Sequence, residues 1–161
     1  MKRNGKTDSL AFAGLTAAAY VVLTMISASM GLSSGVIQIR LSEALCILPC
    51  FNFGAVPGLA AGCLLANLLT GALPWDVLFG TIATLLGALG TWFLGRKGKS
   101  GIAWIPPVLS NALIIPPVLT YVYGVETAYP LIVLTVAAGE VISCGILGLF
   151  LRKAVTRLEN K

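Results

Sequence analysis

The sequence predicts an all-α integral membrane protein with six transmembrane helices in a single domain, residues 1–161. Of the 161 residues, 57% are hydrophobic and 11% are charged, whereas about a quarter of the residues in a soluble domain are charged. Ten of the eleven basic residues lie in three short clusters separated by apolar sequence. A spanning helix needs about 20 apolar residues, so six helices with tight loops take up nearly the whole chain. No room remains for a soluble catalytic or nucleotide-binding domain.

The basic clusters predict the orientation of the chain. Positively charged loops stay in the cytoplasm when a membrane protein inserts. Each apolar stretch between two clusters must therefore cross the bilayer an even number of times, four times and then twice, and both termini are expected in the cytoplasm. Membrane orientation accounts for these charges, so the net charge of +5 does not indicate a nucleic-acid partner. The clusters are Lys2, Arg3 and Lys6; Arg96, Lys97 and Lys99; and Arg152, Lys153, Arg157 and Lys161.

Glycine, proline and serine divide the apolar sequence into its helices. A Gly/Ser-rich loop at 31–35 follows the first helix, and Gly54, Pro57 and Gly58 precede or open the third. A tight turn at 71–74 leads into the fourth helix, and the basic segment 96–101 separates the fourth from the fifth. The second helix is short for a span. The predicted helices cover residues 9–30, 38–52, 56–70, 75–94, 103–123 and 129–151.

The first predicted helix carries a stripe of small residues. Ala13, Gly14, Ala17 and Ala18 are spaced so that they share one side of a helix. Small side chains let a second helix approach closely, which is how membrane helices associate. The stripe predicts either a docking face for a partner protein or a contact inside the six-helix bundle.

Polar side chains are rare in the apolar stretches and are candidates for a binding site. A charged group in the bilayer core costs about 2.5–3.5 kcal/mol on insertion scales and marks function by default. In the predicted topology six of these groups converge on a pocket that opens to the outside. Such a pocket is typical of a protein that captures a small polar solute. Arg40, Glu43, Asn67 and Asp76 belong to its outer half, and Asn111 and Glu140 lie near the midplane.

Structural roles are open alternatives for the four charged residues of this set. Arg40 and Glu43 share a face of the second helix and could pair with each other. Asp76 follows a proline at the start of the fourth helix, where an acidic residue suits the positive helix end. Glu140 could pair with Arg40 or bond to a neighbouring helix.

The chain contains no motif for chemistry or energy coupling. It has no histidine, and its cysteines are expected to act as small hydrophobic residues, so no metal or cofactor is predicted. There is no Walker motif, no HExxH and no serine elbow, so we predict no enzyme activity.

These features resemble the substrate-binding S components of energy-coupling factor (ECF) transporters, which are small six-helix proteins with an alanine-rich first helix. The sequence is more specifically similar to the QueT family over essentially the whole chain. The segments that carry this similarity are 39–45 (IRLSEAL), Leu48-Pro49, the turn at Gly54, Pro57 and Gly58, and 73–77 (LPWDV) after the helix of Asn67.

The resemblance implies that the chain captures a queuosine precursor, a 7-deazaguanine such as preQ0 or preQ1, at a prokaryotic plasma membrane. It also implies an ECF transmembrane scaffold subunit and two cytoplasmic ATPases as partners, docked on the stripe of the first helix. The alternatives are an S component for a different vitamin, a stand-alone secondary transporter or channel, and a membrane scaffold without a ligand.

Chemistry then suggests how such a ligand is held. A carboxylate can accept both N–H donors of a guanine-like edge, and Glu140 or Glu43 could supply it. Asn67 or Asn111 could form hydrogen bonds with the carbonyl and ring nitrogens. Asp76 or the second glutamate faces the aminomethyl cation of preQ1. Trp75 or Tyr121 is expected to stack on the ring.

Overall fold

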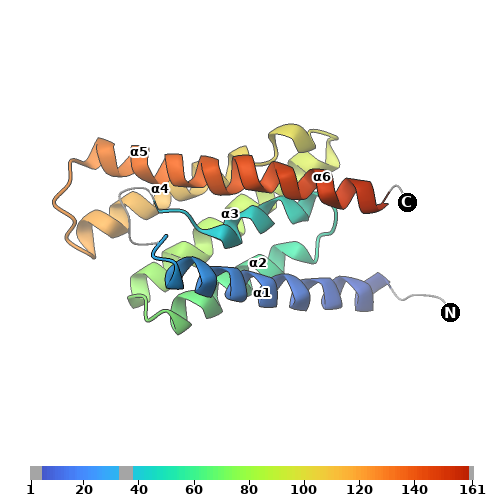
Figure 1. The fold of residues 1–161 in the computed structure, drawn as a ribbon, viewed down its shortest axis with the longest axis horizontal. Helices are drawn as coiled ribbons and strands as arrows, with labels where there is room; N and C mark the ends of the chain where they lie inside the picture. Colours follow the sequence, from blue (N-terminus) through green and yellow to red (C-terminus); the bar gives the residue numbers. More distant parts are fainter. Residues whose placement is uncertain (1–4, 33–37, 160–161) are drawn as a thin grey trace.

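The chain folds into a bundle of helices. The computed structural model describes residues 5–32 and 38–159, and every regular element in these ranges is a helix. Three of the segments are not α-helical: η1 (Leu41–Cys50), η2 (Ser100–Ile102) and η3 (Val141–Leu147). The α-helices are α1 (Gly5–Ser29), α2 (Ala55–Leu69), α3 (Pro74–Arg96), α4 (Ile105–Tyr121), α5 (Tyr129–Glu140) and α6 (Gly148–Glu159) (Figure 1).

Four helical stretches in the described ranges are long and apolar enough to cross a membrane. Two shorter apolar helices, η1 and α2, occupy the places of the second and third predicted spans. The all-helical prediction is therefore confirmed, and six complete crossings remain a prediction. The four long stretches are Thr7–Ser29, Pro74–Arg96, Ser100–Tyr121 and Tyr129–Leu158.

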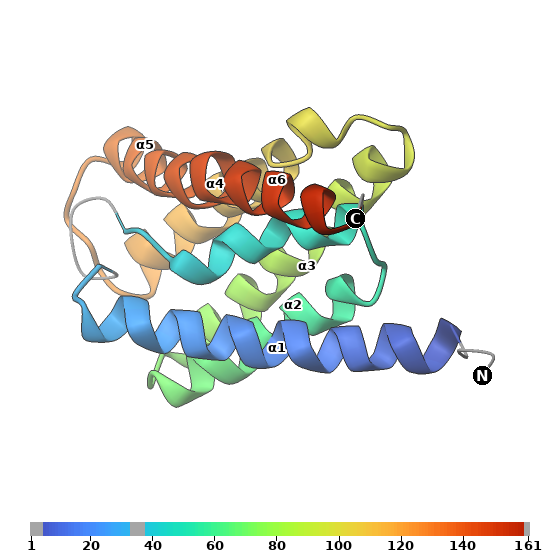
Figure 2. The ribbon, with the colours of Figure 1, turned by 45° about the vertical axis from the view of Figure 1, so that its right-hand side comes forward.

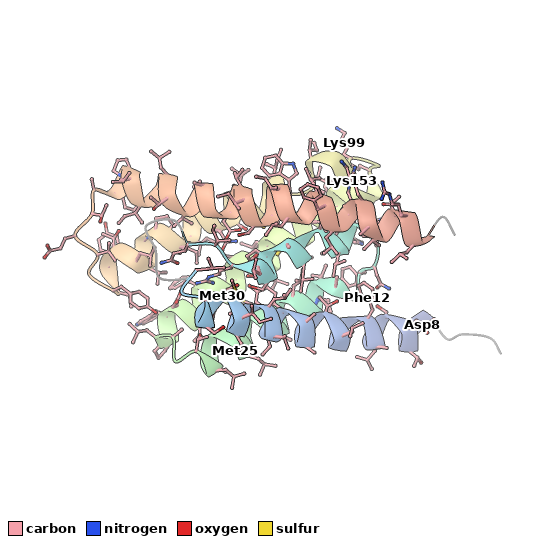
Figure 3. The ribbon with its side chains drawn as sticks, viewed as in Figure 1. Asp8, Phe12, Met25, Met30, Lys99 and Lys153 are labelled. Carbon is pink, nitrogen blue, oxygen red and sulfur yellow. The ribbon has the colours of Figure 1, made fainter. Side chains whose placement is uncertain are left out.

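The described basic clusters lie at one end of the bundle. Figure 3 shows Lys99 and Lys153 at the end where α1 begins near Asp8, whereas Met30 lies toward the other end of α1. Helix α1 begins and helix α6 ends on this side (Figure 1). This one-sided distribution is what the orientation rule requires. The side chains of Lys2, Arg3, Lys6 and Lys161 lie outside the described residues.

The second predicted α-helix is a 3₁₀ helix instead, so the prediction of an α-helix over 38–52 is wrong. Pro49 lies inside η1, and in an α-helix its ring would collide with the carbonyl four residues earlier. The 3₁₀ geometry rises about 2.0 Å per residue, so ten residues extend about 20 Å, against about 15 Å as an α-helix. It also aligns every third side chain. Glu43, Cys46 and Pro49 accordingly form one buried row.

The 3₁₀ segment η1 is the central element of the fold. It contacts α1, α2, α3, η3 and α6. Figures 1 and 2 both show it between α1 on one side and the continuous helix α5–η3–α6 on the other. The hydrophobic core surrounds it and includes Leu45 and Cys46 of η1 together with Tyr20, Leu59 and Cys144.

Helices α1 and α2 pack through glycines on α2. Gly58 and Gly62 are one helical turn apart, and a Cβ atom on either would lie within 2.7 Å of α1 atoms. The atoms concerned are the Ala13 carbonyl oxygen and the Tyr20 Cβ. The absence of side chains at these positions therefore sets how closely the two helices approach, as in other membrane helix pairs.

The last predicted helix is longer than expected and changes its winding. α5, η3 and α6 run without a break from Tyr129 to Glu159, and η3 is a π-helical stretch. A Cβ on Gly139 would collide with the carbonyl oxygen of Gln38, so this helix presses directly on the chain that leads into η1. The π turn begins directly after Glu140 and buries Ser143 and Cys144. Such π segments frequently occur at functional sites.

The glycine contact predicts the effect of a substitution. Gly62→Val should lower the free energy of unfolding by about 1–3 kcal/mol, because the new Cβ forces Tyr20 and α1 away. Thermal unfolding of the detergent-purified protein measures this change. Gly14→Val is the matched control, since a Cβ at Gly14 meets nothing within 4 Å. Equal melting temperatures for the two variants would contradict the packing assigned to Gly62.

Candidate functional site

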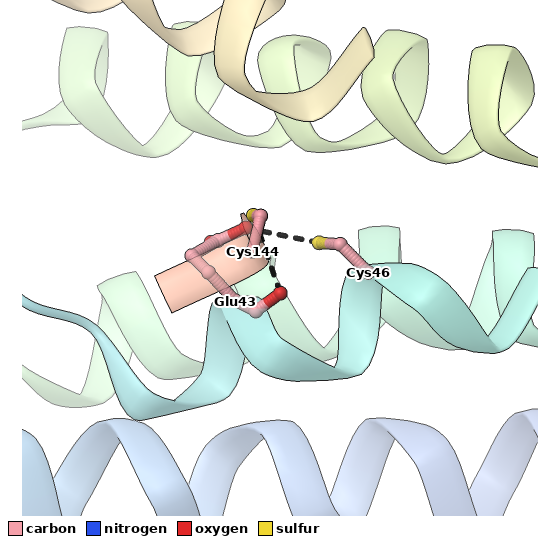
Figure 4. A group of neighbouring side chains, drawn as sticks. All are labelled: Glu43, Cys46 and Cys144. Carbon is pink, nitrogen blue, oxygen red and sulfur yellow. Dashed lines mark hydrogen bonds between the residues drawn. The ribbon is translucent and has the colours of Figure 1, made fainter. Parts of the chain in front are cut away.

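The side chain of Glu43 lies at the centre of a buried polar site. It projects from η1, and the residue is only 1% exposed. The hydroxyl of Tyr20 on α1 donates a hydrogen bond to Oε1 of Glu43, and the thiol of Cys46 donates to Oε2 at 2.9 Å. Both oxygens therefore have neutral donors. Figure 4 shows Glu43, Cys46 and Cys144 gathered between η1 and η3.

A second buried carboxylate, Glu140, joins the same site from the end of α5. It is 9% exposed, and its Oε2 accepts from the thiol of Cys144 at 3.2 Å. The same thiol lies 3.3 Å from the backbone carbonyl oxygen of Glu43. Cys144 therefore connects the two acidic residues and with them η1 and η3. We call Tyr20, Glu43, Cys46, Glu140 and Cys144 the carboxylate cluster.

Arg40 supplies the positive charge beside this cluster. The residue is half-buried just before η1, and its backbone N–H donates to the hydroxyl of Ser143 at 3.3 Å. Its guanidinium interacts electrostatically with Glu43, Asp76 and Glu140. Within the described part of the chain, the direct donors to Glu43 are Tyr20 and Cys46 rather than Arg40. Three acidic side chains therefore lie within electrostatic reach of one guanidinium.

Asp76 and Asn67 form the other side of the site. Both residues are buried. Both side chains point toward Gly80, because a Cβ atom at that glycine would lie 3.0 Å from Nδ2 of Asn67 and 4.0 Å from Oδ1 of Asp76. The hydroxyl of Tyr123 donates to Oδ2 of Asp76 at 3.1 Å. Partial burial raises the pKa of Tyr123 above its ordinary value, so this hydroxyl keeps its proton and remains a donor.

Three residues expected at the site do not join this cluster. Asn111 is buried, but its amide donates to the Pro107 carbonyl of its own helix at 3.1 Å. Trp75 is 57% exposed and stacks on Phe79 with ring centroids 6.1 Å apart. Tyr121 is 83% exposed. Tyr123, two residues further along, is the aromatic residue that contacts Asp76.

Sequence reasoning missed Tyr20, Cys46, Cys144 and Tyr123. The signal for Tyr20 was present, because Thr16, Tyr20, Thr24 and Ser27 recur every three or four residues and are all buried. This face of α1 meets η1: the hydroxyl of Thr24 donates to Ser42, and that of Ser27 accepts from the backbone of Leu41, both at 2.9 Å. The thiols gave no such signal, because an isolated cysteine in an apolar helix is usually a small hydrophobic residue.

The small residues of the α1 stripe face two different sides of the helix. Ala13 and Ala17 are partly buried against Gly58 and Gly62 of α2. Gly14 and Ala18 are exposed on the outer surface of the bundle. One half of the stripe therefore makes the internal contact, and the other half is free for a second protein or for lipid.

A cavity of about 270 Å³ is lined by residues close in sequence to Arg40 and Glu140. Val136, one of its lining residues, is one helical turn before Glu140, and Gln38 is two residues before Arg40. The cavity lies toward the end of the bundle opposite the basic clusters, because residues of the α4–α5 connection also line it. The lining residues are Gln38, Leu119, Val125, Thr127, Leu131, Ile132, Thr135 and Val136.

The cluster also contains potential metal ligands. Glu43, Cys46 and Cys144 each offer one ligand atom, and the three atoms lie within 4.8 Å of one another. Both thiols, however, act as hydrogen-bond donors to carboxylate or carbonyl oxygens. These hydrogen bonds account for the grouping without a metal ion.

The buried hydroxyl of Tyr20 provides a test of this geometry. Tyr20→Phe should lower the free energy of unfolding by about 1–3 kcal/mol, because it removes a donor from a buried carboxylate. Tyr121→Phe removes the same hydroxyl from an exposed position and should change little. Thermal unfolding in detergent compares the two variants. If the Tyr20→Phe protein is as stable as the Tyr121→Phe protein, the hydrogen bond to Glu43 does not contribute to the free energy of unfolding.

Comparisons with known proteins identify the family. The QueT transporter family matches residues 10–157. The queuosine precursor transporter QueT of Lactococcus lactis subsp. cremoris (strain MG1363) is 34% identical over 85 residues. That match covers 52% of this chain and 49% of the relative, so it spans about half of each protein. No solved structure matches. The family match covers most of the chain, which therefore belongs to the QueT transporter family.

Proposed function

We propose that this member of the QueT transporter family is the substrate-binding membrane subunit, the S component, of an ECF importer. In this proposal it captures a 7-deazaguanine queuosine precursor, preQ0 or preQ1, from outside the cell. The observation that carries the proposal is the pair of buried carboxylates, Glu43 and Glu140, whose hydrogen-bond donors among the described residues are all neutral. The name of the Lactococcus lactis relative supports the choice of ligand.

The carboxylates match the chemistry of a deazaguanine. Its pyrimidine edge presents adjacent N–H donors, and one carboxylate accepts two such bonds at once. Hydrogen bonds that involve an ionised partner are roughly twice as strong as neutral ones. A ligand that replaces thiol donors with these N–H groups therefore gains affinity. Asn67, buried beside Asp76, offers both a donor and an acceptor for the remaining polar atoms.

The charge of the site favours preQ1 within this class. Acidic side chains outnumber the single guanidinium in a largely buried region, where an unpaired charge is costly. The aminomethyl group of preQ1 is a cation, whereas the nitrile of preQ0 is neutral. A cation would balance the excess of acidic groups, and Asp76 is its proposed partner because the side chain that bonds it in the described structure is the neutral hydroxyl of Tyr123.

The membrane topology of the proposal has six crossings with both termini in the cytoplasm. Arg96, Lys99 and Lys153 then lie on the cytoplasmic side, and the cavity near Gln38 opens outward. The extended 3₁₀ geometry of η1 supports its assignment as a crossing, because it gives ten residues the reach of a longer α-helix.

Energy for uptake has to come from partner subunits in this proposal. The sequence contains no nucleotide-binding motif. The proposed partners are an ECF transmembrane scaffold and two cytoplasmic ATPases. Gly14 and Ala18 are the half of the α1 stripe available to the scaffold, since Ala13 and Ala17 contact α2. A stand-alone transporter, by contrast, would accumulate the ligand in liposomes that contain this chain alone.

Isosteric substitutions test the binding site. Glu43→Gln and Glu140→Gln should each weaken preQ1 binding by about tenfold or more, because each removes a charged acceptor from a buried ligand contact. Titration calorimetry on the purified full chain measures the affinity. Glu126→Gln makes the same change in the exposed α4–α5 connection and should bind like the parent protein. Parent-like affinity in both cluster variants would refute the carboxylate site.

Bulky substitutions on α1 test the partner face. Ala18→Trp should abolish uptake by cells that also express the ECF scaffold and ATPases, because the indole holds the partner helix away. Binding of preQ1 by the purified variant should persist, since Ala18 is exposed and belongs to no site contact. Ala17→Trp should instead destabilise the chain, because Ala17 packs against Gly62. Full uptake by the Ala18→Trp strain would refute docking at this face.

A further inference from the structure

The proposed function leaves the thiols of Cys46 and Cys144 without a role, although they are the donors that hold the two carboxylates. Cys46 donates to Glu43 at 2.9 Å, and Cys144 donates to Glu140 at 3.2 Å. Both cysteines are buried. The thiols therefore occupy acceptor positions that a bound ligand needs (Figure 4).

Cys144 has two acceptors for a single hydrogen. Its sulfur lies 3.2 Å from Oε2 of Glu140 and 3.3 Å from the backbone carbonyl oxygen of Glu43. One S–H group can point well at only one of them. Rotation of this hydrogen toward the carbonyl frees the Glu140 carboxylate without leaving the thiol unpaired.

A thiol is well suited to giving up such a bond. The S–H group is a weak donor, and a buried cysteine otherwise behaves as a small hydrophobic residue. A serine hydroxyl at the same place would bond more strongly to the carboxylate, and its burial without a partner would be more costly. A cysteine thiol thus donates a hydrogen bond to the carboxylate when no ligand is bound, and losing that bond costs little free energy.

We propose that Cys46 and Cys144 are positioning residues whose thiols act as temporary donors to Glu43 and Glu140 and are displaced by the N–H groups of the ligand. The inference rests on the proposed function, because it assigns the ligand to these two carboxylates. It adds two residues that tune affinity without needing to contact the ligand.

Affinity in serine and alanine variants separates this role from a structural one. Cys46→Ser and Cys144→Ser should each weaken preQ1 binding by about tenfold, because the ligand must displace a stronger donor. Cys46→Ala and Cys144→Ala should bind at least as tightly as the parent protein, because no donor has to be displaced. A merely structural hydrogen bond predicts the reverse order, with serine preserving function and alanine losing it.

Cys50 provides the matched control. It lies on the same 3₁₀ helix, but its thiol donates to the Thr91 carbonyl oxygen at 3.7 Å rather than to a carboxylate. Cys50→Ser and Cys50→Ala should both bind preQ1 like the parent protein.

Infrared difference spectroscopy of the full-length protein observes the displacement directly. The S–H stretching bands of Cys46 and Cys144, assigned with the serine variants, should move to higher frequency when preQ1 is added, because the S–H bond strengthens when its hydrogen bond weakens. Bands of Cys50 should not move. If the parent protein binds preQ1 while these bands stay fixed or the serine variants bind normally, the positioning role is refuted and the proposed function stands. If the parent protein binds neither preQ1 nor preQ0, the proposed function fails, and this inference fails with it.

Discussion

The bond between the Tyr20 hydroxyl and the Glu43 carboxylate is the interaction on which the rest of the structure depends. It joins α1 to η1 in the interior of the bundle, where an unpaired carboxylate would be very costly. The second oxygen of Glu43 is held by Cys46, and its backbone carbonyl accepts from Cys144. One residue therefore connects three segments that are distant in sequence. The position of η1, and with it the position of the site, follows from satisfying this single buried charge.

Close packing of small residues makes these bonds possible. Gly58 and Gly62 bring α1 near enough to α2 for Tyr20 to reach inward, and Gly139 lets the last long helix press on the chain at Gln38. The polar face of α1 then meets η1 through Thr24 and Ser27. Glycines that make no hydrogen bond of the site thus set the helix separations on which its hydrogen bonds depend.

Much of the fold could be predicted from the sequence, because the signals for helices in a membrane protein are local. Hydropathy and turn residues placed all six helical segments in order, and the cost of burying charge correctly indicated that Glu43, Asp76 and Glu140 are buried. The winding of η1 and η3 depends on neighbours that hydropathy does not reveal. Tyr121 and Tyr123 show the same limit: they are two residues apart at the end of α4, but only Tyr123 contacts Asp76. Tyr20 and Tyr123 donate to carboxylates of distant segments, so these contacts could be found only in three dimensions. Cys46 and Cys144 instead lie three and four residues along the chain from the carboxylates to which they donate.

The shortness of η1 has a consequence for biogenesis. A segment of ten residues with a carboxylate in its first turn is too short and too polar to enter a bilayer by its own hydropathy. Its polar groups are satisfied by Tyr20, Thr24 and Ser27 of α1, the helix made just before it during synthesis. In the proposed topology with six crossings, α1 would therefore act as a template: η1 would enter the membrane by pairing with α1 as the chain emerges, and a substitution on that face of α1 would first impair insertion.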